Sequence, residues 1–307
     1  MPKNIKFFLI TLLISLPLWW SANNFQGNLE KFFYAQISEP VGQIIEIKLP
    51  QKPPLELKAK SAISIKIGRS LKEKTLFRKN TSEILPLASL TKLMTALVVL
   101  EDPNYDLKGL VTVSKTAASQ EDVPNYGNLK VGENFTVEKL LELMLSYSSN
   151  DSAYALAELI GVENFINKMN FKARELGITQ TQFLNPTGLD PESLFYGQNT
   201  QRYFNYSTAD DLAVLAKYIF KNHPVIFETT LKKKAYTVNN GISDLVLADS
   251  QKMLGGKTGY TDEALGCLAF LFRDESGNVF LNVILGSPSV ESRVKDAQKL
   301  INWINSL

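Results

Sequence analysis

The sequence predicts an α+β fold in which both ends of the folded body contribute strands to one sheet, with a helical lobe inserted between them. Stretches that alternate apolar and polar residues, as strands do, lie near the two ends of the body. The middle instead has apolar residues at three- and four-residue spacing, as helices do. The 307 residues, 45% hydrophobic and 21% charged, are ample for one large core. We therefore expect one large or bilobed domain of sheet and helices.

The individual elements follow from the same patterns. Alternation predicts a strand pair within residues 61–79, made of Ser61–Ile67 and Lys74–Arg78, and further strands at 234–247, 264–272 and 279–286. Apolar residues at helical spacing predict helices from Leu90 to Val98 and from Val290 to Leu307, and over 137–146, 151–160, 163–176 and 208–220.

The N-terminal segment is typical of a targeting sequence. Two lysines precede an apolar run, residues 7–20, that ends in two tryptophans suited to a membrane interface. A membrane-spanning helix needs about 20 apolar residues, and this run is shorter. However, no charged residue follows it until Glu30, so the uncharged stretch is longer than the run itself. A cleaved signal peptide is the alternative, yet cutting after Ala22 would place Trp20 where small residues are preferred. We favour an uncleaved anchor, and hence an extracytoplasmic protein tethered to the plasma membrane.

These observations divide the chain into three parts. Residues 1–22 are the signal anchor or signal peptide, and residues 23–57 form a polar, proline-punctuated extracytoplasmic linker. Residues 58–307 form the folded body, with the helical lobe at about 85–225.

Composition excludes several classes of function. The 33 basic and 31 acidic residues leave a net charge of +2, so a nucleic-acid partner is not expected. The single cysteine, Cys267, excludes an internal disulfide and a cysteine-based metal site, and we expect a buried free thiol. The lone histidine, His223, stands at a predicted helix end and is expected to be structural.

Three short motifs follow one another along the body: Ser89-Leu-Thr-Lys92, Ser148-Ser-Asn150 and Lys257-Thr-Gly259. In the first, Ser89 and Lys92 are three residues apart at a helix start, so the amine can reach the hydroxyl. This spacing suits a serine nucleophile with a lysine base. The helix N-terminus also offers N–H groups and partial positive charge to a developing oxyanion.

Lys92 is predicted to be carried into the interior, because its neighbours from Pro86 to Thr95 are mostly apolar or small. A base must be uncharged, and lowering a lysine pKa from about 10.4 toward 7 corresponds to about 4.6 kcal/mol. Burial supplies shifts of that order, and a second cation adds to them. Lys257 is the candidate for that cation.

The other two motifs add polar groups. Ser148 and Asn150 lie between two predicted helices, where they can project into a cleft, although capping of the next helix is an alternative. Lys257 and Gly259 precede an apolar stretch, so we expect them on or beside a strand, where the glycine lets a substrate approach the backbone.

The three motifs in this order resemble those of the serine D-alanyl-D-alanine carboxypeptidases of the peptidase S11 family, the low-molecular-weight penicillin-binding proteins. The resemblance covers most of residues 61–307 and is highly specific. It implies a β-lactamase/transpeptidase-like fold, with a five-stranded antiparallel sheet flanked by helices and an inserted all-α lobe. The segments that carry it are Pro86–Ala96, Ser148–Ala153, Met169–Gly177, Phe183–Leu189, Ser207–Leu212 and Gly256–Glu263.

The resemblance implies roles for three catalytic residues. Ser89 would attack the carbonyl of the penultimate D-Ala of a peptidoglycan stem pentapeptide, and Lys92 would accept its proton. Ser148 would relay a proton to the leaving D-Ala. Water would then hydrolyse the acyl-enzyme with no metal or organic cofactor, and β-lactam antibiotics would acylate Ser89.

It also implies a substrate-binding set. Asn150 would hold the substrate amide, while Lys257 and Thr258 would hold the terminal carboxylate beside Gly259. The N–H groups of the nucleophile and of Tyr260 would bind the oxyanion. The chain departs from the family where Ser149 replaces the usual glycine and Tyr260 a frequent histidine.

Three alternatives stay open. Some relatives carry an arginine before the third motif, and none lies between Ala235 and Lys257, which leaves room for a D,D-endopeptidase that cuts crosslinks. A β-lactamase of class A needs a general-base glutamate on a loop where this chain has Phe183–Leu189, which contains none. A non-catalytic wall-binding protein is disfavoured because every ionisable catalytic position is filled.

Overall fold

The computed structural model describes residues 3–37, 54–120, 128–190, 204–232 and 244–307, and it divides into two units, Met1–Lys52 and Pro53–Leu307. The first unit contains helix α1 (Lys3–Ile37), which continues beyond the predicted boundary at residue 22. Within the described residues, the stretch Asn4–Phe32 of this helix is long and apolar enough, by length and composition, to cross a membrane.

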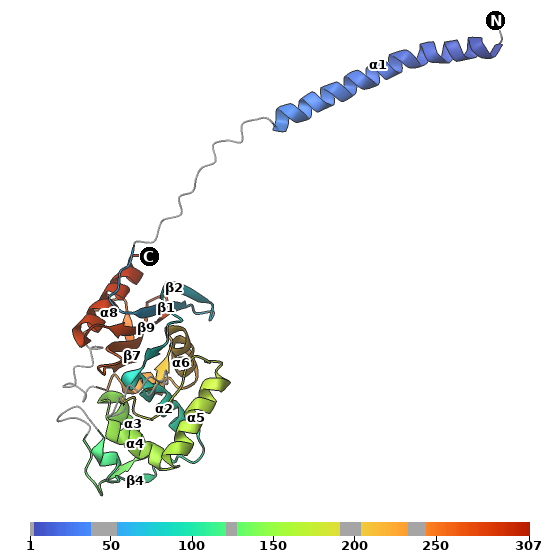
Figure 1. Ribbon diagram of the computed structural model, residues 1–307. Coiled ribbons are helices and arrows are strands. Elements are labelled where there is room, and N and C mark those ends of the chain that lie inside the picture. Colours follow the sequence, from blue (N-terminus) through green and yellow to red (C-terminus); the bar gives the residue numbers. More distant parts are fainter. Residues whose placement is uncertain (1–2, 38–53, 121–127, 191–203, 233–243) are drawn as a thin grey trace, which may run out of the picture. The chain divides into compact units, whose positions relative to one another are not determined.

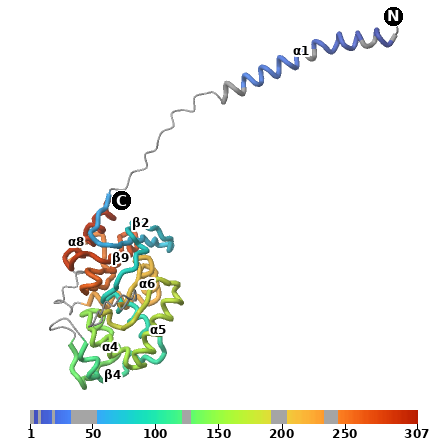
Figure 2. Tube along the Cα trace, in the orientation of Figure 1, coloured from blue at the N-terminus to red at the C-terminus, as the bar shows by residue number. Residues whose placement is uncertain are grey.

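A five-stranded antiparallel sheet forms the centre of the second unit. Its strands are β1 (Ser61–Ile67), β2 (Glu73–Lys79), β7 (Lys252–Gly259), β8 (Gly266–Arg273) and β9 (Val279–Ser287). They lie in the order β2-β1-β9-β8-β7. Figure 2 shows the early strand β2 and the late strand β9 within the same body, and β1 pairs directly with β9. The predicted sheet from both ends of the body is confirmed.

Helices cover both faces of this sheet, which explains why its central strands are buried almost continuously. Successive side chains of β8 point to opposite faces. Leu268 and Phe270 pack with helix α8 (Val290–Asn305), whereas Ala269 and Leu271 belong to the core shared with the helical lobe. Figure 1 shows α8 on one side of the sheet and α2 (Thr91–Glu101) and α6 (Ala209–Asn222) on the other.

The helical lobe lies between β2 and β7 in the sequence, as predicted. Two lobe helices, α3 (Val137–Ser146) and α6, begin after a threonine, Thr136 or Thr208, whose hydroxyl accepts a backbone N–H of the first turn. Helix α8, on the other face of the sheet, begins in the same way after Ser289. The lobe helices are α2 (Thr91–Glu101), α3 (Val137–Ser146), α4 (Asn150–Glu158), α5 (Val162–Glu175), α6 (Ala209–Asn222) and α7 (Val225–Thr229). Two small ribbons pair β3 (Leu85–Pro86) with β6 (Tyr206–Ser207) and β4 (Leu110–Thr112) with β5 (Asn134–Thr136).

The edge strand β7 is not among the strands that the alternation pattern predicted. Most of the predicted stretch 234–247 lies outside the described residues, and its described part, 244–247, is not a strand. The remaining strand of the sheet is β7, which the alternation pattern missed. The pattern fails there because the pairing with β8 shifts between Met253 and Gly255, and Gly255 has a φ of +129°. Such a bulge breaks the two-residue period.

Candidate active site

Ser89 lies in a short 3-10 turn, Ala88–Leu90, that leads directly into α2. The preceding residue, Ala88, has a φ of +45°, a left-handed backbone conformation that is uncommon for a residue with a side chain. Helix α2 is buried on nearly every side, so it carries Lys92 into the interior, where the side chain is 0% exposed. The predicted burial of Lys92 is confirmed.

The contacts of the Lys92 amine include oxygens from three segments of the chain. Its Nζ lies 2.9 Å from Ser89 Oγ, 2.6 Å from Asn150 Oδ1 and 2.6 Å from the Thr187 carbonyl. The amide and carbonyl oxygens can only accept hydrogen bonds, whereas a hydroxyl can also donate. A neutral amine can therefore donate two N–H groups to Asn150 and Thr187 and turn its lone pair toward the Ser89 hydroxyl. This is the geometry that a general base needs.

The second motif occupies the loop between α3 and α4. Ser149 is the N-cap of α4, and its hydroxyl accepts the Ser152 N–H at 3.1 Å. The capping interpretation thus applies to the middle residue of the motif. Ser148 has a φ of +62°, and Asn150 begins the helix and contacts Lys92. The loop therefore directs its outer two residues at the other motifs.

The third motif lies on the edge strand β7. Lys257 pairs with Ala269 of β8, so its side chain shares the face that meets the helical lobe. Its Nζ donates to Ser148 Oγ at 2.8 Å and to the Thr258 carbonyl at 2.9 Å. Burial, followed by the charges of Lys92 and Arg293, holds the pKa of Lys257 well below its usual range.

The end of β7 lies against the nucleophile's backbone. A Cβ built on Gly259 would come within 3.0 Å of the Ser89 nitrogen and of the Leu87 carbonyl, so only glycine fits without displacing this turn. The following residue, Tyr260, is 47% exposed. The backbone N–H groups of Ser89 and Tyr260 therefore belong to adjoining segments. All eight predicted site residues fall on segments that the fold brings together.

Sequence reasoning assigned no role to the residues that support the nucleophile from behind. Asn185 Oδ1 accepts the N–H groups of Thr187 and Gly188 at 3.1 and 2.7 Å, which shapes a tight turn and aims the Thr187 carbonyl at Lys92. Asn205, 2% exposed, donates to Thr91 Oγ1 at 2.9 Å, and its carbonyl accepts the Leu87 N–H at 3.0 Å. The Asn-Pro-Thr-Gly sequence carries a turn signal, whereas Asn205 carries none.

Gly188→Ala is expected to lower the free energy of unfolding by about 2–4 kcal/mol, combining left-handed strain with overpacking. Gly188 has a φ of +85°, and an added Cβ would lie 2.0 Å from the Ala88 carbonyl oxygen. Urea unfolding measures the loss. Gly132→Ala is the matched control, because its φ is +86° and nothing lies within 4 Å of the added Cβ. Equal losses in the two variants would contradict the close approach.

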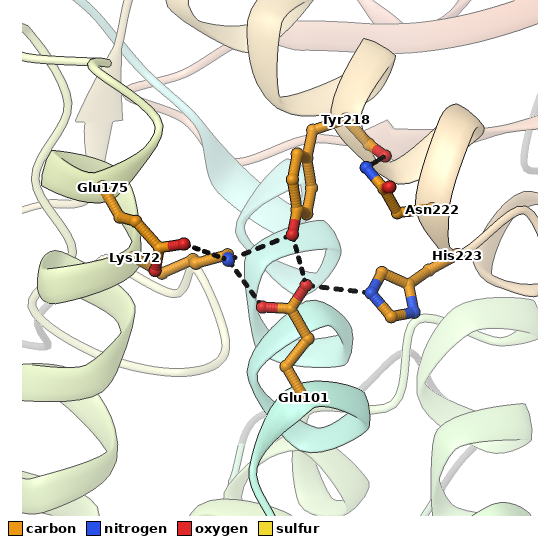
Figure 3. Close-up of polar contacts among 6 residues, drawn as sticks. All are labelled: Glu101, Lys172, Glu175, Tyr218, Asn222 and His223. Carbon is orange, nitrogen blue, oxygen red and sulfur yellow. Dashed lines mark hydrogen bonds and ion pairs between the residues drawn. The ribbon is translucent and has the colours of Figure 1, made fainter.

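The far end of the nucleophile helix is held by a charged cluster (Figure 3). Glu101, the last residue of α2, accepts from Lys172 at 2.7 Å, Tyr218 at 2.8 Å and His223 at 2.9 Å. Burial alone would raise the pKa of Glu101, but these hydrogen bonds outweigh it and lower that pKa. The cluster ties α2 to α5 and α6. His223 is the C-cap of α6, in agreement with its predicted structural role.

Cys267 lies in β8 behind the site and is 0% exposed, so the predicted buried free thiol is confirmed. Burial raises the pKa of this thiol to about 11. The thiolate that would react is therefore scarce at neutral pH, and the residue is inert packing.

The geometry can be compared with known proteins. The profile of the peptidase S11 family, described as D-alanyl-D-alanine carboxypeptidase, matches residues 47–288. The chain belongs to this family. Its relatives include the D-alanyl-D-alanine carboxypeptidase DacF of Bacillus subtilis, 32% identical over 259 residues. That alignment covers 80% of this chain and 61% of the Bacillus protein.

Other relatives differ in their named activity. The D-alanyl-D-alanine endopeptidase of Escherichia coli is 30% identical over 245 residues, covering 76% of this chain and 74% of that protein. Among solved structures, Penicillin-Binding Protein D2 from Listeria monocytogenes in the cefotaxime-bound form is 28% identical, with a TM-score of 0.66. The structural match covers 82% of this chain and 98% of the Listeria chain. The β-lactamase/transpeptidase-like fold expected from the sequence is thus confirmed.

Proposed function

We propose that this protein is a serine D-alanyl-D-alanine carboxypeptidase that removes the terminal D-Ala from peptidoglycan stem pentapeptides. The observation that carries the proposal is the 2.9 Å contact between the Ser89 hydroxyl and a fully buried Lys92 amine, which also contacts two oxygens that can only accept hydrogen bonds. This arrangement generates an alkoxide nucleophile without a histidine. Membership of the S11 family supports the same chemistry.

In the first half-reaction, Ser89 Oγ forms a bond to the carbonyl carbon of the penultimate D-Ala while its proton passes to Lys92. The backbone N–H groups of Ser89 and Tyr260 stabilise the oxyanion. The C–N bond then breaks, and the leaving amine of the terminal D-Ala takes a proton from Ser148, which takes one in turn from Lys257. The 2.8 Å contact between Ser148 and Lys257 supports this relay, because it links the hydroxyl to a buried lysine with a lowered pKa.

Substrate binding follows from the remaining groups of the site. Asn150 contacts Lys92 through its Oδ1 and also holds the substrate amide. The position of the bound substrate is thereby fixed relative to the general base. Lys257 and Thr258, beside Gly259, bind the terminal carboxylate. In the second half-reaction, water adds to the acyl-enzyme carbonyl and gives a proton through Ser148 to Lys257. The ester C–O bond then breaks, and Lys92 returns its proton to Ser89 Oγ, with no metal or organic cofactor.

The similarity to an E. coli endopeptidase favours a second candidate, cleavage of D-Ala crosslinks between stem peptides. Digestion of purified muropeptides separates the two. We expect release of free D-Ala from pentapeptide to exceed conversion of crosslinked dimers to monomers, as measured by chromatography and mass. Dimer cleavage without free D-Ala would support the endopeptidase instead. No turnover of either substrate would overturn both.

The location of the enzyme is part of the proposal. The apolar stretch of α1 is consistent with a signal sequence or an anchor, and we propose that it tethers the catalytic domain, residues 58–307, to the outer face of the plasma membrane. Peptidoglycan stem peptides and β-lactams are the partners expected there, and nucleic acid is not.

A further inference from the structure

Arg293 is a buried cation that the catalytic motifs do not include. It lies in the first turn of α8 and is 3% exposed. Its Nη1 donates to the Gly259 carbonyl at 2.8 Å and, more weakly, to the Cys267 carbonyl at 3.4 Å. These two residues face each other in the β7–β8 ladder. The guanidinium therefore joins α8 to the end of the strand that carries the third motif.

Stability alone does not explain this placement. Burial lowers the pKa of Arg293, and a cation in the first turn of a helix opposes the helix dipole. Among the described residues, no carboxylate lies within ion-pair distance of Arg293; the acidic residue on its own turn, Glu291, is solvent-exposed and bonds Ser289. A buried polar or apolar side chain would cost less at this position.

The fold makes room for the arginine. Gly266 opens β8, and a Cβ built there would lie 3.0 Å from Arg293 Cβ and 2.7 Å from the Ser289 carbonyl. A glycine thus permits the first turn of α8 to approach the strand closely. Arg293 can then reach past β8 to β7.

We propose that Arg293 is a positioning residue that orients the Gly259–Tyr260 peptide so that the Tyr260 N–H faces the oxyanion. This inference rests on the proposed function. Gly259 is the last residue of β7 to pair with β8, so the ladder does not hold the next peptide group. In a planar trans peptide the C=O and N–H point in opposite directions. Anchoring the Gly259 carbonyl on Arg293 therefore directs the Tyr260 N–H away from α8, and the positive charge polarises that N–H.

The experiment compares Arg293→Met and Arg293→Lys by the rate of acylation with a fluorescent penicillin, measured across penicillin concentrations. We expect Arg293→Met to lower the maximum acylation rate by about 10–100-fold, less than the 10²–10³-fold of a deleted oxyanion donor. The constant for noncovalent penicillin binding should change by less than about twofold, since the oxyanion forms only in the transition state. Arg293→Lys retains a charged donor and should restore most of the rate.

Trp303→Leu is the control for mere destabilisation. Trp303 lies on the same helix and packs edge-on against Phe77, away from β7. The Trp303→Leu substitution should lower the melting temperature and leave the acylation rate unchanged. Arg293→Gln repeats the test of Arg293→Met with a different uncharged side chain. Three outcomes would overturn this inference without affecting the proposed function. They are a wild-type acylation rate in both Arg293→Met and Arg293→Gln, an Arg293→Lys variant as slow as Arg293→Met, and an equal rate loss in Trp303→Leu. Unlabelled wild-type enzyme would overturn the proposed function as well.

Discussion

Ser89→Ala is expected to abolish covalent labelling by a fluorescent penicillin and to lower D-Ala release by about 10⁴–10⁶-fold, as loss of a nucleophile does in other serine hydrolases. The substitution removes the only atom that forms the acyl bond. The Ser89 side chain is partly exposed, so the fold should persist. Intact mass spectrometry after incubation with penicillin measures the adduct directly.

Ser119→Ala supplies the control, because this serine also lies in a 3-10 turn but is exposed and distant in sequence from the three motifs. It should be labelled like the wild type. An adduct that persists in Ser89→Ala would refute the assignment of the nucleophile. Loss of the wild-type adduct within seconds would instead favour the β-lactamase alternative.

Lys92→Met is expected to slow acylation by about 10²–10⁴-fold, the usual contribution of a general base. Methionine preserves most of the buried volume but cannot accept the Ser89 proton. The Asn150 and Thr187 oxygens also lose a donor, so the melting temperature should fall. Time-resolved labelling with a fluorescent penicillin measures the rate, and thermal unfolding measures the stability.

Lys172→Met separates these two effects. Lys172 is another buried lysine of the helical lobe, 7% exposed, and it bonds Glu101 rather than any residue of the site. Its replacement should destabilise the lobe and leave acylation close to the wild-type rate. If both variants acylate equally slowly, Lys92 is structural; if Lys92→Met acylates normally, another group is the base.

Local sequence patterns predicted the parts of the site that local geometry determines. The three-residue spacing of Ser89 and Lys92, with apolar neighbours, was enough to predict a buried amine beside a hydroxyl, and the structure has both features. The helices of the lobe followed from the same kind of signal. Each of these predictions depends on residues within one or two helical turns.

Long-range contacts had no such signal. The Thr187 carbonyl reaches Lys92 from 95 residues away in sequence, and the Asn205 amide reaches Thr91 from 114 residues away. Neither contact repeats with any period. Arginine is usually exposed on an amphipathic helix, so nothing in the sequence indicated that Arg293 is buried. Its burial follows from the close packing of α8 against Gly266, which only the structure shows. The alternation pattern missed strand β7 because its bulge hides the two-residue period, although the expectation that Lys257 and Gly259 lie on or beside a strand is confirmed.

The order of strands in the sheet has a consequence for how the enzyme matures. Strand β1 pairs with β9, so the first strand of the folded body cannot form this pairing until a strand close to the C-terminal end of the chain is available. Such distant pairings make folding slow, since a long loop must close before the contacts form. Lys257 joins β1 only through β8 and β9, so a nascent chain halted before β9 would carry all three motifs without a continuous sheet to align them. We therefore expect the three motifs to align only once β9 is available to pair with both β1 and β8.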